Sequence, residues 1–348
     1  MSHRSLIRRV APVLAVAFGF TLAASAQTGA TSGPVPRTAD GHPDMDGTWT
    51  NVTITPLERP KEFANKEFFT PAEALVYEKE TRTKRNRDQR QRGTVADVTN
   101  AYNDFWWDSG TKVVKTLRTS MVIDPPDSRI PALTPERLKQ LQVRVDAVKV
   151  RCAQPGCEEE NSGLLGPADG PEDRPLMERC IHFGTIGPPM MPSAYNNNFQ
   201  IVQTPGFVAI EGEMVHDTRR ILLDNSPRLP ASVRQWKGDS RAHWEDDTLV
   251  IDTTNFTGET RFRGSDENLH LTERLTMVDK DTIMYRFTVD NPTAFVRPWT
   301  AEYPLLRQDG LLYEYACHEG NSGLVGILKA ARSDEAKAAA KDRLETTK

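Results

Sequence analysis

The sequence predicts a mainly β fold, an antiparallel meander that closes into a barrel or a strongly curled sheet, with helices outside it. Nine segments of the second half alternate apolar and polar residues, as strands do. They are residues 199–204, 207–215, 220–224, 240–245, 248–254, 269–278, 282–289, 299–303 and 311–317. Turn sequences such as Pro205-Gly206 and Gln308-Asp309-Gly310 separate them, as in hairpins. A meander of this length tends to close on itself.

The N-terminus has the features of an export signal. Arg4, Arg8 and Arg9 precede an apolar run that ends at Ala23, and Ala24-Ser25-Ala26 offers a cleavage site. The apolar run is shorter than the ~20 residues of a membrane-spanning helix. We therefore expect residues 1–26 to be a signal peptide, with an uncleaved anchor as the alternative. The mature protein would be periplasmic or extracellular and would have no membrane span.

The charge argues against a nucleic-acid partner. The chain carries a formal net charge of -4, and loss of the three arginines of residues 1–26 would take it to -7. Such an acidic chain is a poor nucleic-acid binder. The basic cluster at 82–92 is interpreted as the solvated face of a helix. We expect a small-molecule ligand or substrate, and the sequence does not define the oligomeric state.

The first third of the domain combines short strands with two helices. After a flexible segment, 27–46, a strand is predicted at 47–52 and another at 117–123. A helix over 70–92 begins at Thr70-Pro71-Ala72-Glu73, which is a capping box with proline at the first helical position. A second helix, 135–150, follows Thr134 and places apolar residues at helical spacing.

The middle of the chain has a different texture. Residues 154–198 are rich in proline and glycine, and a connector of this length usually covers a site or lies over the surface. Its end, Met190 to Tyr195, is a candidate pocket lining. A helical tail follows Gly323, with frayed residues over 333–348. We expect one β-rich domain over 47–332.

Four cysteines form an even set, as in the disulfide frameworks of exported proteins. Cys152 and Cys157 flank a turn-forming spacer, which favours a local bond and leaves Cys180 to pair with Cys317. The alternative is a zinc or iron site that uses Cys317 and His318, although no Cys-x-x-Cys pair accompanies it. No other cofactor is predicted.

Three histidines and two carboxylates are the candidate catalytic residues. Side chains alternate across a strand, so Glu273 stands alone on an apolar face of 269–277. It must either meet an arginine or be an acid with a raised pKa. Segment 313–321 is dense in titratable groups, but Glu314 and His318 would lie roughly 13 Å apart on a strand and need partners elsewhere. The candidates are His216, His270, Glu273, His318 and Glu319.

Arginines, aromatic residues and carboxylates recur on the later strands. Arg241 and Arg274 are candidates to hold an anionic group, and an arginine near Trp244 suits a sugar or a carboxylate, a salt-bridged turn being the simpler interpretation. The candidate substrate-binding residues are Asp239, Arg241, Trp244, Arg274, Tyr285, Trp299 and Glu302.

No complete catalytic motif is present in the sequence, which lacks a Gly-x-Ser-x-Gly elbow, a phosphate-binding Walker loop, a dinucleotide fingerprint and His-Glu-x-x-His. The leading hypothesis is an exported enzyme, a lyase, isomerase or metal-assisted hydrolase without a covalent Ser or Cys nucleophile. His270 or His216 would be its base and a small polar or aromatic molecule its substrate. The alternative is a non-catalytic carrier whose interior holds an apolar ligand. Its lining would be Leu271, Leu275, Tyr285, Phe287 and Trp299, with the histidines on the rim.

Several stretches resemble a family of exported bacterial proteins of uncharacterised function. They are residues 37–43 with 47–51, 124–127 with 133–136, 236–241, 244–250, 268–274 and 313–321. The resemblance covers most of the mature chain and implies no activity. Gly47-Thr48-Trp49 is also similar to the first strand of lipocalin-type (calycin) barrels, although a long stretch of chain separates it here from the main meander.

Overall fold

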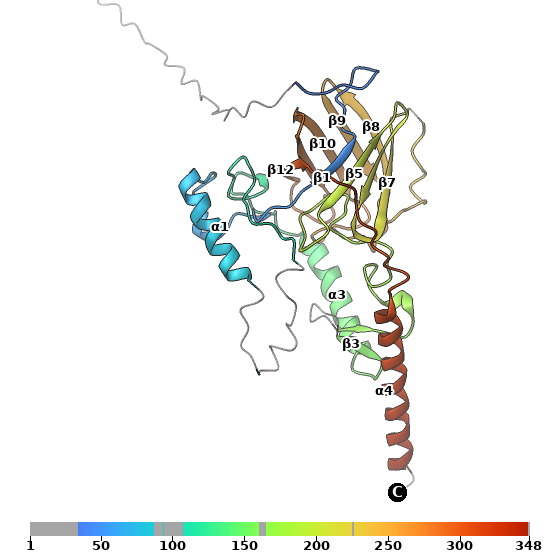
Figure 1. Cartoon of the computed structure of the whole chain (residues 1–348). Coiled ribbons are helices and arrows are strands. Elements are labelled where there is room, and N and C mark those ends of the chain that lie inside the picture. The colour runs from blue at the N-terminus through green and yellow to red at the C-terminus, as the bar shows by residue number, and fades with distance from the viewer. Residues whose placement is uncertain (1–33, 87–92, 94–106, 160–164, 225, 347–348) are drawn as a thin grey trace, which may run out of the picture. The chain divides into compact units, whose positions relative to one another are not determined.

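The computed structural model describes residues 34–86, 93, 107–159, 165–224 and 226–346. Nine strands form a closed barrel within them, which confirms the predicted fold class. In order around the barrel they are β1 (Gly47–Thr50), β5 (Asn198–Gln203), β6 (Phe207–Gly212), β7 (Asp217–Leu222), β8 (Asp239–Glu245), β9 (Thr248–Thr254), β10 (His270–Asp279), β11 (Thr282–Asp290) and β12 (Trp299–Arg307). Figure 1 shows β1 beside β5, with the labelled barrel strands grouped around them. The predicted signal peptide, residues 1–26, lies outside the described residues.

The first strand of the chain, β1, closes the barrel, although it is far in sequence from both of its neighbours. β1 pairs with β5 on one side and with β12 on the other, where Trp49 lies opposite Arg307. Every pair in the barrel is antiparallel except β7 and β8, which are parallel at Leu222 and Arg241. Parallel neighbours need a longer connection than a hairpin, and residues 223–238 provide it. The meander is therefore interrupted once.

Three expected strands differ from the structure. Residues 311–316 form no strand and 317–320 form a turn, because the free edge of β12 is already taken by β1 and by β2 (Val122–Asp124). The strand expected at 117–123 is reduced to β2. The strand expected at 207–215 ends at Gly212, and Met214–His216 forms the short 3-10 helix η4.

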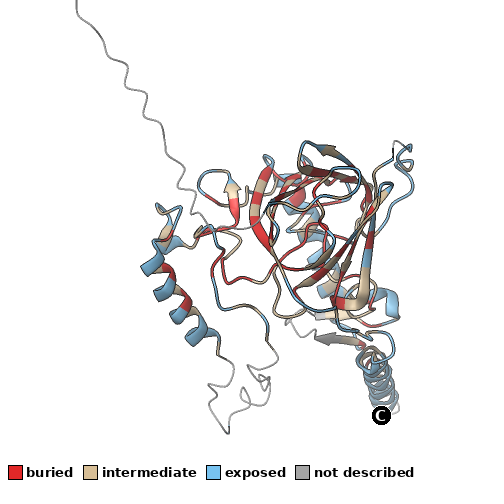
Figure 2. Cartoon of the chain, turned by 45° about the horizontal axis from the view of Figure 1, so that its top comes forward, coloured by how far each residue is buried: buried red, intermediate tan, exposed pale blue. Residues whose placement is uncertain are grey.

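Among the described residues, three α-helices lie outside the barrel: α1 (Pro71–Arg85), α3 (Pro135–Arg151) and α4 (Ser322–Thr346). The capping box of α1 is present, with the Thr70 N–H donating to Glu73 Oε2 at 2.8 Å. The apolar positions of α3 do not form a core, since Leu138 is 55% exposed. Figure 2 shows α4 exposed along most of its length. No helix in the described part of the chain has both the length and the apolar character of a membrane span.

Two disulfides join the cysteines as the sequence favours, Cys152 to Cys157 and Cys180 to Cys317. The first lies at the start of β3 (Cys157–Glu159), which pairs with β4 (Leu165–Pro167). The second ties the connector to the segment before α4. Disulfides persist in oxidising compartments, so both bonds indicate an exported protein.

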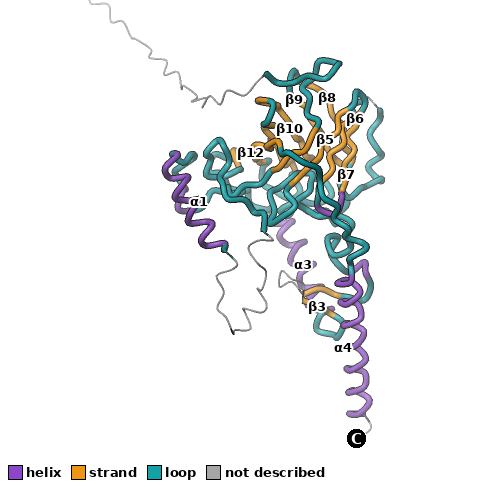
Figure 3. Tube along the Cα trace, in the orientation of Figure 1, coloured by secondary structure: helices purple, strands orange, loops and turns teal. Residues whose placement is uncertain are grey.

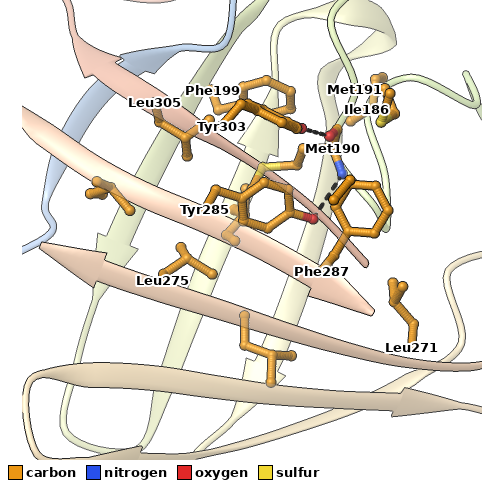
Figure 4. Close-up of a cluster of buried hydrophobic side chains, with 14 of the residues drawn as sticks. Ile186, Met190, Met191, Phe199, Leu271, Leu275, Tyr285, Phe287, Tyr303 and Leu305 are labelled. Atoms are coloured by element: carbon orange, nitrogen blue, oxygen red, sulfur yellow. Dashed lines mark hydrogen bonds between the residues drawn. The ribbon is translucent and has the colours of Figure 1, made fainter. Parts of the chain in front are cut away.

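Apolar and aromatic side chains fill the barrel. Leu271, Glu273 and Leu275 share one face of β10, as its alternation predicts, and the structure turns this face inward. The rings of Tyr285, Phe287, Trp299 and Tyr303 contact one another in the same core. The connector adds Met190 and Met191, whose side chains enter this cluster (Figure 4).

The N-terminal segment covers the end of the barrel at the β8–β9 hairpin. Arg37 makes two hydrogen bonds with Asp247, at 2.7 and 2.8 Å, and the His42 ring stacks on Trp244 with centroids 4.5 Å apart. Met45, farther along the same segment, is buried. The opposite end is covered by the connector and by the loops that follow β9 and β11.

Candidate functional site

Glu273 is part of a buried ion pair. Its side chain is 0% exposed, and Arg219 of β7 donates to Oε2 at 2.5 Å. Tyr285 of β11 donates its hydroxyl to Oε1 at 2.7 Å. Burial, together with the nearby Glu273, raises the pKa of Tyr285 well above its ordinary value. The sequence left two interpretations of Glu273, an arginine partner or an acid with a raised pKa. The structure shows the arginine partner, Arg219.

This ion pair also holds the connector. The Met190 N–H donates to the Tyr285 hydroxyl at 3.1 Å, and the Tyr303 hydroxyl donates to the Met190 carbonyl (Figure 4). A chain of hydrogen bonds thus runs from Glu273 in the barrel wall to the backbone of the connector. Buried polar groups require such partners, so these hydrogen bonds fix the connector at the end of the barrel opposite the β8–β9 hairpin. We call this end the mouth.

His270 faces outward from β10. Its Nε2 contacts the carboxylate of Asp252 on β9, and Arg228 pairs with the same carboxylate. The hydrogen bond with Asp252 raises the pKa of His270. The side chain is 45% exposed. This histidine therefore forms a surface ion-pair cluster.

Segment 313–321 meets His216 through its backbone. The Tyr315 N–H donates to His216 Nε2 at 3.0 Å, and the Tyr313 N–H donates to Glu213 at 3.3 Å. His318 and Glu319 are exposed. Across the described residues, no contact joins the imidazoles of His216, His270 and His318. The structure brings the segment to His216 but not the three histidines to one point.

The expected substrate-binding residues have other partners. Arg241 pairs with Asp239 at 2.6 Å, and Arg274 pairs with Glu245 at 2.8 Å, so neighbouring carboxylates neutralise both arginines. The remaining residues also have partners within the protein. Glu302 forms an ion pair with Arg286, Trp244 stacks on His42, and Tyr285 and Trp299 are buried in the core.

A histidine outside the predicted set, His182, is buried and contacts a carboxylate, as catalytic histidines often do. His182 is 5% exposed, and its Nδ1 lies 3.1 Å from Asp217 Oδ2. Lys237 contacts the other oxygen of Asp217 and donates to the Thr218 carbonyl at 2.7 Å. We call His182, Asp217 and Lys237 the mouth triad.

Three separate elements position the mouth triad. Asp217 is the first residue of β7, and Lys237 lies in the turn that leads into β8. That turn needs Gly238, whose φ is +69° and where a Cβ would collide with the Thr254 carbonyl oxygen. His182 follows the Cys180–Cys317 disulfide in a turn closed by the Ile181 N–H bond to the Leu176 carbonyl, at 2.9 Å.

The environment keeps His182 neutral. Burial lowers the pKa of His182 to about 4, and the positive charge of Lys237 adds to this effect. Burial also lowers the pKa of Lys237 to about 8. A carboxylate only accepts hydrogen bonds, so Nδ1 carries the proton that faces Asp217. The lone pair of the imidazole is then on Nε2, which makes no hydrogen bond with any residue that the structure describes.

His182 lines a cavity of about 550 Å³ at the mouth of the barrel. One wall is the turn at 172–177, another is α3 with Arg144, and a third is the loop 259–262. Phe262 joins the cavity to the barrel core, because its ring stacks on Trp299 with centroids 5.8 Å apart. Figure 3 shows the loops of this end in teal. The lining residues are Arg144, Glu172, Asp173, Arg174, Pro175, Leu176, Met177, His182, Gly184, Pro188, Glu259, Thr260, Arg261 and Phe262.

The sequence reasoning missed His182. Asp217 directly follows the candidate His216 in the chain, but in the structure it binds His182 from the connector. One signal was available, because the expected pairing of Cys180 with Cys317 already places residue 182 near segment 313–321. The alternation of strands carries no such information about a loop residue.

Comparisons with known protein families, with curated proteins and with solved structures find no match to this chain. The class is therefore defined by fold and chemistry: a disulfide-bonded, mixed β-barrel with a buried histidine and carboxylate beside a cavity at its mouth. The fold and the disulfides are compatible with an exported barrel protein. Within the described residues, no three His, Cys, Asp or Glu side chains are grouped as a metal site requires, and zinc or iron stays a prediction.

Proposed function

We propose that this protein is an exported enzyme in which His182 is the general base for a small substrate bound in the mouth cavity. The observation that carries the proposal is the mouth triad, in which a buried, neutral imidazole is oriented by a carboxylate and lines a cavity. A base with a free nitrogen and a fixed tautomer suits proton abstraction. The reaction class remains that of a lyase, isomerase or hydrolase without a covalent Ser or Cys nucleophile.

The other members of the triad would shape the proton transfer. Asp217 holds Nδ1 and stabilises the imidazolium that forms when Nε2 takes a proton from the substrate. The positive charge of Lys237 and the buried position oppose that imidazolium, so the proton is readily returned to the product. Together they give His182 a low basicity, which suits a substrate proton that is itself acidic.

The alternative function, a carrier, requires an apolar barrel interior with room for a ligand. The interior is apolar, since Leu271, Leu275 and Tyr285 of β10 and β11 point inward. However, these side chains pack against one another, and Met190 enters among them. We therefore assign the ligand to the mouth cavity and not to the interior.

Chemical modification tests the state of His182 without a known substrate. Diethyl pyrocarbonate acylates the free nitrogen of a neutral imidazole. At pH 6 we expect His182 to react faster than His270, because the pKa of His182 is about 4 and that of His270 is raised. Peptide mass spectrometry after timed reaction measures both sites in one sample. An unmodified His182 beside a modified His270 contradicts the proposal.

Turnover tests the reaction itself. Small carboxylic acids, hydroxy acids, esters and lactones would be incubated with the protein and followed by proton NMR. We expect His182→Gln to lower the rate of any turnover by about 10² to 10⁴, the usual contribution of a general base. His270→Gln is the matched control, because its side chain lies on the outer wall. Equal rates for both variants would remove His182 from the reaction.

A further inference from the structure

We infer that the mouth cavity binds an organic acid, with its carboxylate on Arg144 and Arg261 and its apolar body against Leu176, Met177 and Phe262. This inference deepens the proposed function, on which it rests for the role of His182. It names a ligand class, an apolar or aromatic carboxylate. Binding itself requires no catalysis, so it is measured separately.

Both arginines line the cavity, and neither makes an ion pair with a carboxylate in the described part of the chain. Arg144 of α3 makes no hydrogen bond or ion pair with the residues that the structure describes. Arg261 donates its Nε to the Gly258 carbonyl at 3.0 Å, which leaves its two terminal nitrogens available. A guanidinium offers paired donors that match the two oxygens of a carboxylate. Arg144 and Arg261 come from two different walls, but their charges act on each other, and together they make a binding end for an anion.

Neighbouring positive charge strengthens this argument. Arg137 lies nearby on α3, where it bonds only neutral oxygens, including the carbonyls of Gly264 and Ser265 at 2.8 and 2.6 Å. Burial, and then the charges of Arg144 and Arg137, lower the pKa of Arg261, while the charge of Glu259 acts in the opposite direction. Bound anionic oxygens would offset this repulsion.

Several acidic lining residues already have local roles. Asp173 accepts the Gly170 N–H at 2.9 Å and so closes its own turn, and Glu259 lies 3.9 Å from Arg179. The third lining arginine, Arg174, is buried and paired with Glu178 at 2.8 Å. The arginines that remain for a ligand are therefore Arg144 and Arg261.

The apolar part of the lining lies next to the base. The Leu176 carbonyl accepts the Ile181 N–H at 2.9 Å, so Leu176 and His182 belong to the same turn. Phe262 follows Arg261 directly in the chain and presents an aromatic ring to the cavity. A ligand with a carboxylate and an apolar body would contact both the arginines and the apolar side chains of the lining, whereas an inorganic anion would contact only the arginines.

Ligand titrations followed by NMR test the inference, with benzoate, benzamide and inorganic phosphate as probes. Benzamide has the ring without the charge, and phosphate has charge without a ring. We expect benzoate to bind at least about tenfold more tightly than benzamide, which lacks the charged oxygens, and than phosphate, which lacks the apolar ring. Arg144→Gln and Arg261→Gln should each weaken benzoate by about tenfold.

Arg263→Gln is the matched control, because Arg263 is exposed in the same loop and does not line the cavity. Its benzoate affinity should equal that of the unmodified protein. Absence of saturable benzoate binding, equal affinity for benzamide or phosphate, or an equal loss in Arg263→Gln each overturns the inference. His182→Gln should retain benzoate binding. A failed titration therefore leaves the diethyl pyrocarbonate test intact, and a failed base leaves the titration intact.

Discussion

Two histidines of this protein have opposite acid-base properties because their surroundings differ. His182 is buried beside Lys237, and its pKa falls to about 4, whereas His270 lies on the surface beside Asp252, and its pKa rises. Both contact an aspartate, so the carboxylate alone does not decide the outcome. Burial does, because it removes the water that stabilises the charged form.

The low pKa of His182 predicts a loss of stability in mild acid. Above pH 6.5 the imidazole is neutral in both the folded and the unfolded chain. Between pH 6.5 and about 4, only the unfolded chain takes up the proton, so the free energy of unfolding falls. The drop due to this group should approach about 3 kcal/mol, from 1.36 kcal/mol per pKa unit.

Urea unfolding of the unmodified protein and of His182→Gln, at pH 7 and at pH 4.5, measures this drop as a difference between the two proteins. Other groups titrate in both proteins and cancel. An equal fall in both, with no excess in the unmodified protein, would mean that His182 is not held neutral.

His270 should behave in the opposite sense and weakly. Its pKa is raised, so the ion pair with Asp252 stabilises the fold below pH 6.5 and is lost as the pH rises through the raised value. Because the side chain is 45% exposed, we expect His270→Gln to cost less than about 1 kcal/mol at pH 6. The difference should vanish at pH 9, and thermal unfolding at both pH values measures it.

The two sets of residues that share a face of β10 were predictable, since alternation is a property of a single strand. The sequence indicates that Glu273 shares a face with Leu275 and His270 shares the other with Arg274, and the structure buries the first face and turns the second outward. The partners of Glu273 were not predictable, because Arg219 and Tyr285 come from other strands. The expected strand at 311–317 failed for a related reason: its pattern is sound, but the edge it needs is occupied.

The buried pair between Glu273 and Arg219 should be destabilising to break and nearly neutral to replace. Glu273→Gln leaves Arg219 as an uncompensated buried charge, and we expect a loss of about 3 kcal/mol in the free energy of unfolding. The double variant Arg219→Met with Glu273→Met should recover most of that loss. Urea unfolding of the single and double variants forms the cycle. Equal losses in both would show that the pair itself stabilises the barrel.

At the scale of the whole molecule, closure depends on residues far apart in the chain. The strands of the second half were predictable from local alternation and turns, and eight of the nine expected there are present in some form. The insertion of β1 between β5 and β12, and the parallel step from β7 to β8, join segments that no local pattern relates. The mouth cavity likewise brings together segments that are far apart in the chain, which is why His182 was not among the candidates.

The two disulfides should differ in their effect on stability. The Cys180–Cys317 bond spans 137 residues and the Cys152–Cys157 bond spans 5. Loop-closure entropy in the unfolded chain then predicts losses of about 5 and about 2 kcal/mol when each pair is replaced by serine. Urea unfolding of the two double variants gives the comparison, and each serves as the other's control. A larger loss for the Cys152 and Cys157 pair would contradict this account.

The hydrogen bonds of Met190 have a consequence for amide hydrogen exchange. Its N–H is bonded to Tyr285 and its carbonyl to Tyr303, both inside the barrel, although the residue belongs to a loop. The connector cannot leave the mouth without exposing these phenols and the carboxylate of Glu273. The Met190 amide should therefore exchange only through global unfolding, at the slow rate of the β10 and β11 amides, while amides of exposed loops exchange quickly.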